Sequence, residues 1–577
     1  MADAITEAPP SPVPTVDTRP HGNPFVALAI VLVAAFMILL DISIVNVAIP
    51  SIQRDIHATF SQVQWVIAGY ALAYGVLLIT GGRLGDIVGR KRMFILGVAG
   101  FTVASALCGL SQSGLQLVAF RVLQGLMASM MYPQIFSIIT IAFPPARRPL
   151  ALGLLGGVIG LATITGPLLG GILIQLNIAN LDWRPIFLIN VPVGTAAVIA
   201  AALYLQESRP AAAPKLDIPG VLIASAGLLL LTFPLVEGRD AGWPWWAYAM
   251  LAGSVVVMIG FFVYERRREA QGKDPLMVSR LFHHRSFVVG LLVFLVFFSG
   301  LPATFLTLSL FLQIGLGFSA LKSGLTLIPF AVGSGLFSGL SIRLVPRLGR
   351  KVLNAGAALA SLGILGTIFT IHQVGPGLNG TELIPALFVA GAGLGLMVAP
   401  SLNFIIAAIE PRDIGSASGV LTTVQQVGAA LGIAIIGVIY FGLLSSNADS
   451  IADSLSQQMA QDLQQKGVPA PIANQVGNGF KACFKDRAKE SDPTVVPSSC
   501  QPPQAAPPGA SQAPPQVGQV IQATIADYAN RGRAQDFTDT IQRSLLYNAG
   551  VFGLTFVLLF FLPSPKRPPP LVPGAGH

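Results

Sequence analysis

The chain has 577 residues, of which 53% are hydrophobic and only 11% charged, and its formal net charge is +9. Soluble domains carry about 25% charged residues, so this composition indicates a membrane protein. The apolar residues form uninterrupted blocks and not alternating ten-residue segments, which excludes a β-barrel. The basic residues are scattered as short clusters between these blocks, which favours the lipid bilayer as a partner over nucleic acid.

The apolar blocks predict an all-α membrane protein with fourteen transmembrane helices, since each can cross about 30 Å of hydrocarbon. These spans are 25–49, 63–82, 93–111, 115–141, 150–176, 185–205, 218–237, 245–264, 286–312, 323–342, 352–371, 382–409, 415–443 and 545–562. The first block is too long for a signal peptide and contains Asp41, so we interpret it as a retained helix.

The lysines and arginines predict the orientation, because short loops rich in them stay cytoplasmic. Of the 35, 22 fall on the side of the two termini. The opposite short loops hold only Arg54, Arg184, Arg239 and Lys322. We therefore expect a multi-pass protein of the cytoplasmic (inner) membrane with both termini in the cytoplasm.

Residues 444–544 then lie outside the cytoplasm, and their Gln-, Pro- and Ser-rich composition predicts a partly disordered loop. The run from Pro502 to Pro515 is not expected to fold compactly. Cys483 and Cys500 both lie here, where a disulfide would persist, and the sequence leaves open whether they are bonded. The loop could recruit an envelope partner or be a tether. Residues 1–24 and 563–577 are interpreted as disordered cytoplasmic ends.

Neither a metal site nor a cofactor site is predicted. The six histidines and three cysteines lack the spacing of a structural metal site. No nucleophile–histidine pair occurs among the spans, which disfavours a membrane enzyme.

Two basic, glycine-containing loops indicate an internal repeat. Residues 82–92 read GRLGDIVGRKR and residues 343–351 read RLVPRLGRK, and Gly349 aligns with Gly89 at an offset of 260 residues. The repeat predicts two six-helix halves, 25–205 and 286–562, separated by an inserted helix pair with its linkers at 206–285. Such parallel halves are a common plan among secondary transporters, with a site near the midplane.

Five motifs occur in the order found in one known family. The loop 82–92 matches the pattern G-x-L-x-D-x-x-G-R-K-R. Two motifs are continuous segments, Leu40 to Pro50 (LDISIVNVAIP) and 182–192 (DWRPIFLINVP). The other two are sets of residues within one span: Leu117, Arg121, Gln124 and Gly125 in span four; and Gly153, Gly166, Pro167, Gly170 and Gly171 in span five. Ala162 and Pro185 depart from the usual residues. On these motifs the chain resembles the major facilitator superfamily, specifically its fourteen-helix drug:proton antiporter branch. The resemblance implies export of small molecules in exchange for protons by alternating access.

Asp41 and Arg121 are the acid and the base that lie in the middle of spans, where each charge costs roughly 2.5–3.5 kcal/mol. Asp41 is predicted to be the proton-coupling acid, and the alternative is a structural acid. Arg121 shares a helix face with Gln124 and Tyr132. Because arginine does not deprotonate, its role would be to tune a carboxylate, and the alternative is a structural or snorkelling side chain.

The loop 82–92 is predicted to form a conformational latch. Gly82 and Gly89 permit a tight turn, and the resemblance implies that Asp86 and Arg90 hold the two halves together in one state. In the second half, Pro346 occupies the place of Asp86 and cannot make that contact. The alternative is a loop whose positive charge only sets the orientation.

Two further groups of residues are candidates. The glycines and proline of span five, Gly153, Gly166, Pro167, Gly170 and Gly171, predict either a hinge or close helix packing. Plausible cavity residues are Tyr70, Tyr74, Gln124, Tyr132, Phe136 and Gln425, although such aromatic residues more often serve packing.

The sequence therefore predicts a proton-coupled exporter of lipophilic, possibly cationic, small molecules. Export of a lipid, siderophore or self-made antibiotic on the same fold is the alternative. A channel is the third possibility. No further acid is evident in spans nine to fourteen apart from Glu382 at a helix end, which favours monocations or neutral amphiphiles.

Overall fold

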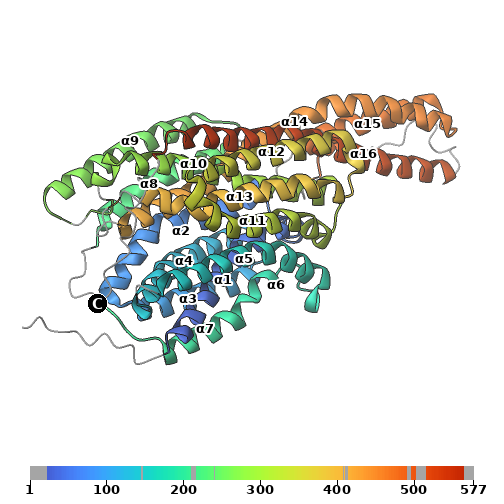
Figure 1. The fold of residues 1–577 in the computed structure, drawn as a ribbon. Helices are drawn as coiled ribbons and strands as arrows, with labels where there is room; N and C mark the ends of the chain where they lie inside the picture. Colours follow the sequence, from blue (N-terminus) through green and yellow to red (C-terminus); the bar gives the residue numbers. More distant parts are fainter. Residues whose placement is uncertain are drawn as a thin grey trace, which may run out of the picture.

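The protein is all-helical in a computed structural model that describes residues 23–144, 147–209, 216–238, 241–273, 275–277, 279–406, 409, 414–489, 496–501 and 515–563. The helices form one elongated bundle (Figure 1). We call the end that carries residues 83–92 and 343–351 the basic end, and the opposite end, where α15 lies, the far end. Twelve helices of the described part are long and apolar enough to cross a membrane.

The N-terminal half contains α1 (Pro24–Asp55), α2 (Phe60–Val88), α3 (Arg90–Gly109), α4 (Gly114–Ala142), α5 (Arg148–Leu176), the 3₁₀ turn η1 (Ile178–Asn180), the short α6 (Pro185–Leu188) and α7 (Asn190–Tyr204). Helix α4 packs against α2 and α3, and α1 packs against α5. Their shared core is aliphatic and aromatic, with Ile38, Phe94 and Phe101 buried in it. Span six of the sequence is thus built from two helices, α6 and α7.

The inserted pair consists of α8 (Ile218–Glu237) and α9 (Trp245–Ala270), followed by the 3₁₀ turn η2 (Ser279–His283). These helices pack against each other, and α8 also contacts α2 and α14. Asp217 caps α8 by accepting a hydrogen bond from the Gly220 amide, 3.1 Å away. The same carboxylate accepts from the Tyr264 hydroxyl and pairs with Arg268 of α9. The cap therefore also ties the two inserted helices together.

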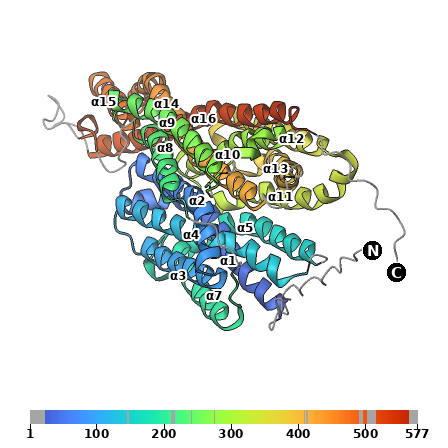
Figure 2. The ribbon, with the colours of Figure 1, turned by 90° about the vertical axis from the view of Figure 1, so that its left-hand side faces the viewer.

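The C-terminal half contains α10 (Arg285–Leu310), the π-helical turn η3 (Phe311–Gly315), α11 (Ala320–Leu348), α12 (Lys351–Val374), the 3₁₀ turns η4 (Gly375–Gly377) and η5 (Thr381–Leu383), α13 (Ile384–Ile406), α14 (Ile414–Gln465), α15 (Ala470–Lys489), the 3₁₀ turn η7 (Ser498–Cys500) and α16 (Pro515–Leu559). Helix α13 packs between α11 and α12, and α10 packs against α14 and α16. Figure 2 shows the two halves side by side, with α8 and α9 along one edge.

Polar residues at the far-end turns start several helices where the sequence places them. Thr59 and Gln62 form a reciprocal capping box at the start of α2. Ser113 and Ser319 cap α4 and α11 by accepting hydrogen bonds from the amides of Gln116 and Lys322. Each cap satisfies a backbone N–H that a helix leaves unpaired at its N-terminus.

The two basic loops of the repeat occupy the same place in the chain path. Gly89, with φ 118°, separates α2 from α3, and Gly349, with φ 55°, separates α11 from α12. Arg350, which aligns with Arg90, donates to the carbonyl oxygens of Phe560 and Leu562 at 2.9 and 2.5 Å. The second loop therefore caps the C-terminus of α16, where a cation is favourable.

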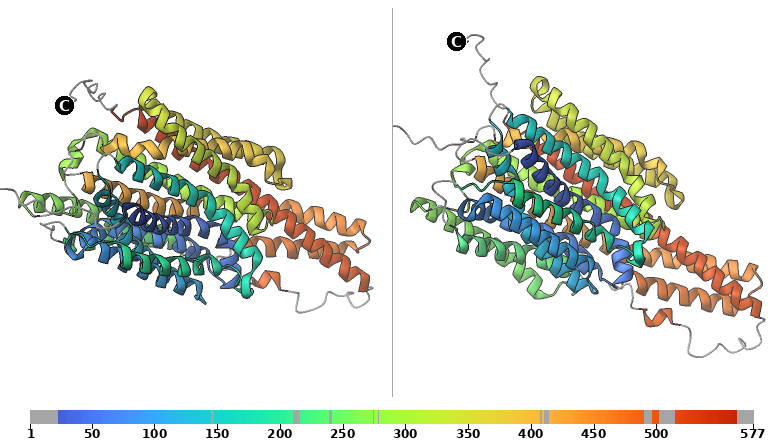
Figure 3. Two further views of the ribbon diagram at one scale, coloured as in Figure 1. Left: turned by 60° about the horizontal axis from the view of Figure 1, so that its bottom comes forward. Right: turned by 90° about the horizontal axis from the view of Figure 1, so that it is seen from below.

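The segment 444–544 differs from the sequence-based expectation. The prediction of a partly disordered loop is wrong for 444–489 and 515–544, because α14 continues to Gln465, α15 packs back along it and α16 begins at Pro515. These helices project beyond the rest of the molecule (Figures 1 and 3). They have a core of their own that includes Met459, Leu463 and Phe480. The proline-rich run 502–514 lies outside the described residues, as do residues 1–22 and 564–577.

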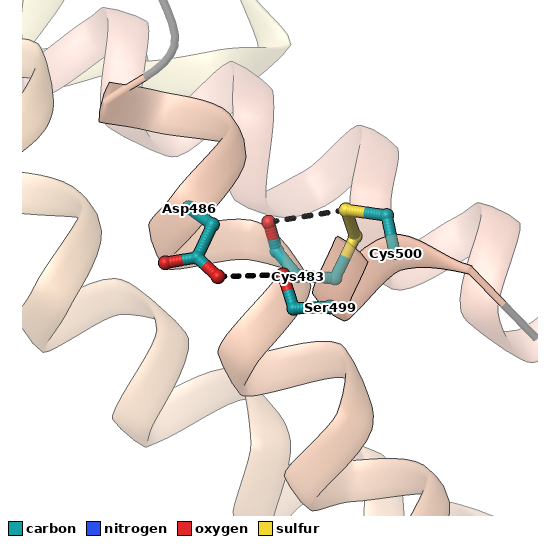
Figure 4. Close-up of a disulfide and its surroundings, with 4 residues drawn as sticks. All are labelled: Cys483, Asp486, Ser499 and Cys500. Carbon is teal, nitrogen blue, oxygen red and sulfur yellow. Dashed lines mark hydrogen bonds between the residues drawn. A yellow bond between two sulfur atoms is a disulfide. The ribbon is translucent and has the colours of Figure 1, made fainter. Parts of the chain in front are cut away.

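A disulfide between Cys483 and Cys500 ties η7 to α15, with the two Cα atoms 4.5 Å apart. Ser499 supports the same contact by donating a hydrogen bond to Asp486, 2.6 Å away (Figure 4). We call the projecting helices, 444–489 and 515–544 with η7, the far-end bundle.

Candidate functional site

A buried ion pair lies inside the N-terminal half, where Asp41 of α1 meets Arg121 of α4. Arg121 Nη1 lies 2.5 Å from Asp41 Oδ2, and the two side chains are 2% and 0% exposed. Removing two charges from water costs several kcal/mol each, which the pair recovers only through close geometry and further hydrogen bonds. The sequence identified both residues and left open whether they meet.

Gln124 and the backbone of α2 complete the coordination of this pair. Arg121 Nη1 also donates to Gln124 Oε1 at 2.7 Å, while Gln124 Nε2 donates to Asp41 Oδ1 at 2.9 Å. Arg121 Nε donates to the carbonyl oxygen of Val66, 3.0 Å away. Gln124 can bridge both charges because residues three apart lie on one face of a helix.

Sequence reasoning missed two further members of the network, Asn190 and Ser105. Asn190 Nδ2 lies 3.3 Å from Asp41 Oδ1 and 3.0 Å from Ser105 Oγ, and Ser105 donates to the carbonyl oxygen of Phe187 at 2.9 Å. Asn190 begins α7, directly after the break that separates it from α6. The sequence signal that could have identified Asn190 was the motif 182–192, which contains it. We call Asp41, Arg121, Gln124, Asn190 and Ser105 the charge network.

Four aromatic rings extend from the charge network toward the basic end. The Tyr70 ring lies 4.2 Å from Arg121 Cζ, a favourable place for a cation. From Tyr70 the ring centroids follow at 6.0 Å to Tyr74, 5.9 Å to Tyr132 and 5.5 Å to Phe136. Tyr70 and Tyr74 are buried, whereas Phe136 is 37% exposed. The predicted cavity residues of α2 and α4 therefore form one continuous row.

Gln425, the remaining predicted cavity residue, lies on α14 and is half-buried. Its neighbour Gln426 packs against α2, where a Cβ on Gly75 would come within 2.6 Å of Gln426 Cβ. The structure thus gives Gln425 no direct part in the charge network.

The loop 82–92 forms the turn between α2 and α3. Asp86 and Arg90 pair with each other at 3.0 Å, so in this conformation their contact lies within the N-terminal half. A Cβ added to Gly82 would meet Pro133 at ordinary contact distance. Arg83 donates to the Pro275 carbonyl in the linker that follows α9. That linker contact connects the loop to the inserted pair.

Glu207, which sequence reasoning did not select, fixes the start of α3. Its carboxylate accepts hydrogen bonds from the amides of Lys91 and Arg92 at 3.1 and 3.3 Å. A Cβ on Gly89 would lie 2.5 Å from this carboxylate, and the backbone there has φ 118°. Glycine is therefore required at residue 89 for both conformation and space.

The glycines of α5 lie against two neighbouring helices. Gly166 and Gly170 pack on α1, where a Cβ would approach Ser43 and Ile44. Gly171 packs on α11 of the other half, with a Cβ only 2.7 Å from Leu321 Cα. Pro167 contributes its carbonyl to the same contact with α11, opposite Gly324. Gly153 lies nearer the basic end of α5. Close helix packing thus accounts for Gly166, Pro167, Gly170 and Gly171.

The two halves also meet through α1, α2, α10 and α14 toward the far end. Ser309 Oγ donates to the Asn46 carbonyl at 2.6 Å, and Gln313 Nε2 donates to the Val47 carbonyl at 2.9 Å. Phe60 of α2 stacks on Phe441 of α14 with ring centroids 4.0 Å apart. We call these contacts, together with Gly171 on Leu321, the far gate.

The motif at 182–192 is explained at the far end of α1. Asp55 Oδ2 accepts from Trp183 Nε1 at 2.9 Å and pairs with Arg184 Nη1 at 2.6 Å. Burial, followed by the nearby Asp55 carboxylate, raises the pKa of Asp182. Trp183 is fully buried, so this segment anchors α6 to α1.

Within the described ranges, no group of three or more His, Cys, Asp or Glu side chains is placed to hold a metal ion. The buried polar centre of the N-terminal half consists of one acid, one base, two amides and a hydroxyl. Such a centre can bind, release and orient protons and hydrogen-bonding ligands. It provides no activated nucleophile.

An apolar bundle of two helical halves with a buried charge network is the architecture of a multi-pass membrane protein. Residues 31–433 match the family model of the Major Facilitator Superfamily. The chain belongs to this superfamily.

Known proteins similar to this chain include antibiotic transport, export and resistance proteins of Streptomyces and Mycobacterium. It is 36% identical over 551 residues to the "Probable actinorhodin transporter" of Streptomyces coelicolor, which covers 95% of this chain and 93% of that protein. It is 35% identical to the "Tetracenomycin C resistance and export protein" of Streptomyces glaucescens, covering 73% of this chain and 76% of that one. It is 30% identical to the "Multidrug resistance protein Stp" of Mycobacterium tuberculosis, covering 72% and 75%.

Solved structures share the fold. A bacterial homologue of the human lysosomal transporter Spinster, in an inward-facing and occupied conformation, superposes with a TM-score of 0.55 at 17% identity. The match covers 92% of this chain and 96% of that one.

Proposed function

We propose that the protein is a proton-coupled antiporter that exports lipophilic small molecules, including cations, by alternating access. The observation that carries the proposal is the buried Asp41–Arg121 pair, held by Gln124 and Asn190 at the centre of the N-terminal half. A carboxylate can take up a proton and a guanidinium does not give one up, so Asp41 is the proton carrier and Arg121 tunes it.

The proposal includes a topology of fourteen spans with the basic end in the cytoplasm. The two spans beyond the twelve apolar helices are α5, whose apolar stretch Thr165–Leu176 is shorter, and the second half of α16. The distribution of lysine and arginine supports this orientation. The Cys483–Cys500 disulfide supports it as well, because the far-end bundle then lies in the oxidising compartment.

In this assignment the far gate is the outer gate, and the structure represents the state closed on the outside. The row from Tyr70 to Phe136 then leads from the charge network toward the cytoplasm and provides an aromatic wall for a lipophilic cargo. The Asp86–Arg90 latch would engage the C-terminal half in the opposite state, since here both residues contact each other.

A self-made antibiotic is the second candidate cargo, which one observation favours. The alignment with the "Probable actinorhodin transporter" covers 95% of this chain, so it must include most of residues 444–544. The matches to the tetracenomycin and multidrug relatives cover 73% and 72%. The relative whose alignment includes the far-end bundle is therefore one that is named for a single antibiotic, actinorhodin.

The test uses purified protein in proteoliposomes with an imposed pH gradient and an internal pH dye. Addition of ethidium should cause proton counterflow in the wild type and none in Asp41→Asn. Asp55→Asn is the matched control, because it makes the same change on the same helix and keeps an oxygen for Trp183. Equal counterflow in wild type and Asp41→Asn would remove Asp41 from coupling.

If ethidium moves no protons in any variant, puromycin and tetracenomycin C follow as cargo in the same vesicles. Counterflow with an antibiotic alone would select the second candidate. Flux that does not saturate and persists in Asp41→Asn would identify a channel.

A further inference from the structure

The C-terminal half contains a buried acid that the charge network does not use. Asp536 of α16 is 3% exposed at the base of the far-end bundle. Its Oδ1 lies 3.5 Å from Thr540 Oγ1, which accepts a hydrogen bond from Asn447 Nδ2 of α14 at 3.2 Å. Arg543 Nη1 donates to the same asparagine at 3.1 Å. An arginine is therefore close, but it is joined to Asp536 only through two intermediate side chains.

Polar residues continue from Asp536 along one face of α16 into the membrane-embedded part. Thr540, Ser544 and Asn548 follow at successive intervals of four residues, and each is fully buried. Among the described residues, the hydroxyl of Ser544 and both amide atoms of Asn548 have no hydrogen-bond partner, and neither does the buried hydroxyl of Tyr440 on α14. Buried polar groups without partners are costly, so a row of them indicates a path for water or protons.

This acid lies directly behind the outer gate. Phe537, the next residue, packs against Gly315 of η3 and has its ring 6.2 Å from that of Tyr440. Tyr440 is followed by Phe441, whose ring stacks on Phe60 of the N-terminal half. When the halves separate on the outside, Phe441 loses this partner, and the adjacent contact between Tyr440 and Phe537, beside Asp536, is free to open.

We propose that Asp536 is a second proton-binding site, on the outer side of the C-terminal half, and that its protonation holds the outer gate closed. The inference rests on the proposed function, because it requires the far gate to open during the transport cycle. Asp539 and Arg543 on α16 and Tyr440 on α14 are ionisable groups near Asp536. His372 of α12 contacts the same part of α16, with its Nδ1 3.1 Å from Gln542 Oε1. The turn η3 carries none.

The sign of the effect follows from the burial of Asp536 in the closed state. Burial, followed by the nearby Asp539 carboxylate, raises the pKa of Asp536 to about 8. Hydration on opening would return this pKa toward the ordinary value of about 4. The closed state thus binds the proton more tightly, so it gains stability as the pH falls below about 8 and loses it as the pH rises through 8. Between pH 9 and pH 6 the ratio of closed to open molecules should rise by up to about a hundredfold.

The experiment measures gate opening by distance between two spin labels in lipid nanodiscs. The labels are placed on Ile178→Cys in the N-terminal half and Gln373→Cys in the C-terminal half, both exposed at the far end. Cys108→Ala removes the free thiol, and the Cys483–Cys500 disulfide stays intact because no reductant is used. The closed fraction should fall as the pH is raised from 6 to 9.

In Asp536→Asn, which imitates the protonated acid, the closed distance should persist across this pH range. Asp539→Asn is the matched control, since it removes a like charge one helical turn away. It should keep the transition and lower its midpoint. Asp536→Glu retains a titrating group and should also keep a transition, which covers the case in which Asp536→Asn does not fold.

Three results would overturn the inference. They are a wild type without a pH-dependent distance change, an Asp536→Asn protein with the wild-type transition, and a closed state that depends on Na⁺ at fixed pH. The measurement needs neither cargo nor proton flux, so equal counterflow in wild type and Asp41→Asn would count against Asp41 coupling and leave this inference standing.

Discussion

Replacing Arg121 by methionine removes one charge of a buried pair and leaves the other. Because both side chains are nearly inaccessible and their nearest atoms lie 2.5 Å apart, either single neutralisation should cost roughly 3–5 kcal/mol. Because about 1.4 kcal/mol corresponds to a tenfold change in an equilibrium constant, this cost is a hundredfold to several thousandfold change in the unfolding equilibrium. Asp41→Asn should cost a similar amount at pH 7.5, since it leaves the guanidinium with only neutral acceptors, Gln124 and the Val66 carbonyl.

The two variants should differ in their response to pH. In Arg121→Met the stranded carboxylate can take up a proton, so the cost of this variant should fall as the pH is lowered from 7.5 to 5.5, by at most about 1.4 kcal/mol per pH unit. The arginine left by Asp41→Asn stays charged, so that cost should not change over this range. Equilibrium unfolding in mixed SDS micelles, followed by tryptophan fluorescence, measures both.

The double variant Asp41→Asn/Arg121→Met completes the cycle. It removes both charges and should be less destabilised than the sum of the single variants by 2 kcal/mol or more, because a buried pair can often be replaced by neutral groups at little cost. Additive costs, or an Arg121→Met penalty independent of pH, would refute the view that these side chains stabilise each other.

Three further variants test other parts of the structure. Gly89→Ala should destabilise the α2–α3 turn by about 1–2 kcal/mol from its backbone conformation alone, whereas Gly550→Ala, with open space around it, should be close to neutral in the same unfolding assay. Glu207→Ala should accelerate amide hydrogen exchange at Lys91 and Arg92, and unchanged rates would show that the carboxylate does not cap α3. In intact cells, Cys483 should react with an impermeant maleimide only after an impermeant reductant is added, and labelling without reductant would contradict the disulfide.

The sequence predicted the helices and the candidate residues within them better than the contacts between helices. Hydrophobic blocks place most spans within a few residues, and the three-residue spacing of Arg121 and Gln124 correctly placed both on one face. That Asp41 lies against this face depends on how α1 packs on α4, which no local pattern encodes. Asn190 was hidden for the same reason, since its contact with Asp41 requires α7 to return beside α1.

The error at 444–544 has a different physical origin. The Pro- and Gln-rich stretch dominated the composition of the whole segment and hid its helical periodicity. Ala473, Gly477 and Phe480 lie on the buried face of α15 at intervals of four and three residues, which is the pattern of an amphipathic helix. Asp536 was overlooked as a consequence, because an acid assigned to a disordered loop is not expected to be buried.

The charge network constrains when Asp41 can take up a proton. Protonating Asp41 in the dry site would leave Arg121 charged, with only the Gln124 and Val66 oxygens as acceptors, at a cost comparable to breaking the pair. Water around the guanidinium would reduce this cost, because a hydrated charge needs no counter-ion. Proton exchange at Asp41 and hydration of the network are therefore thermodynamically linked.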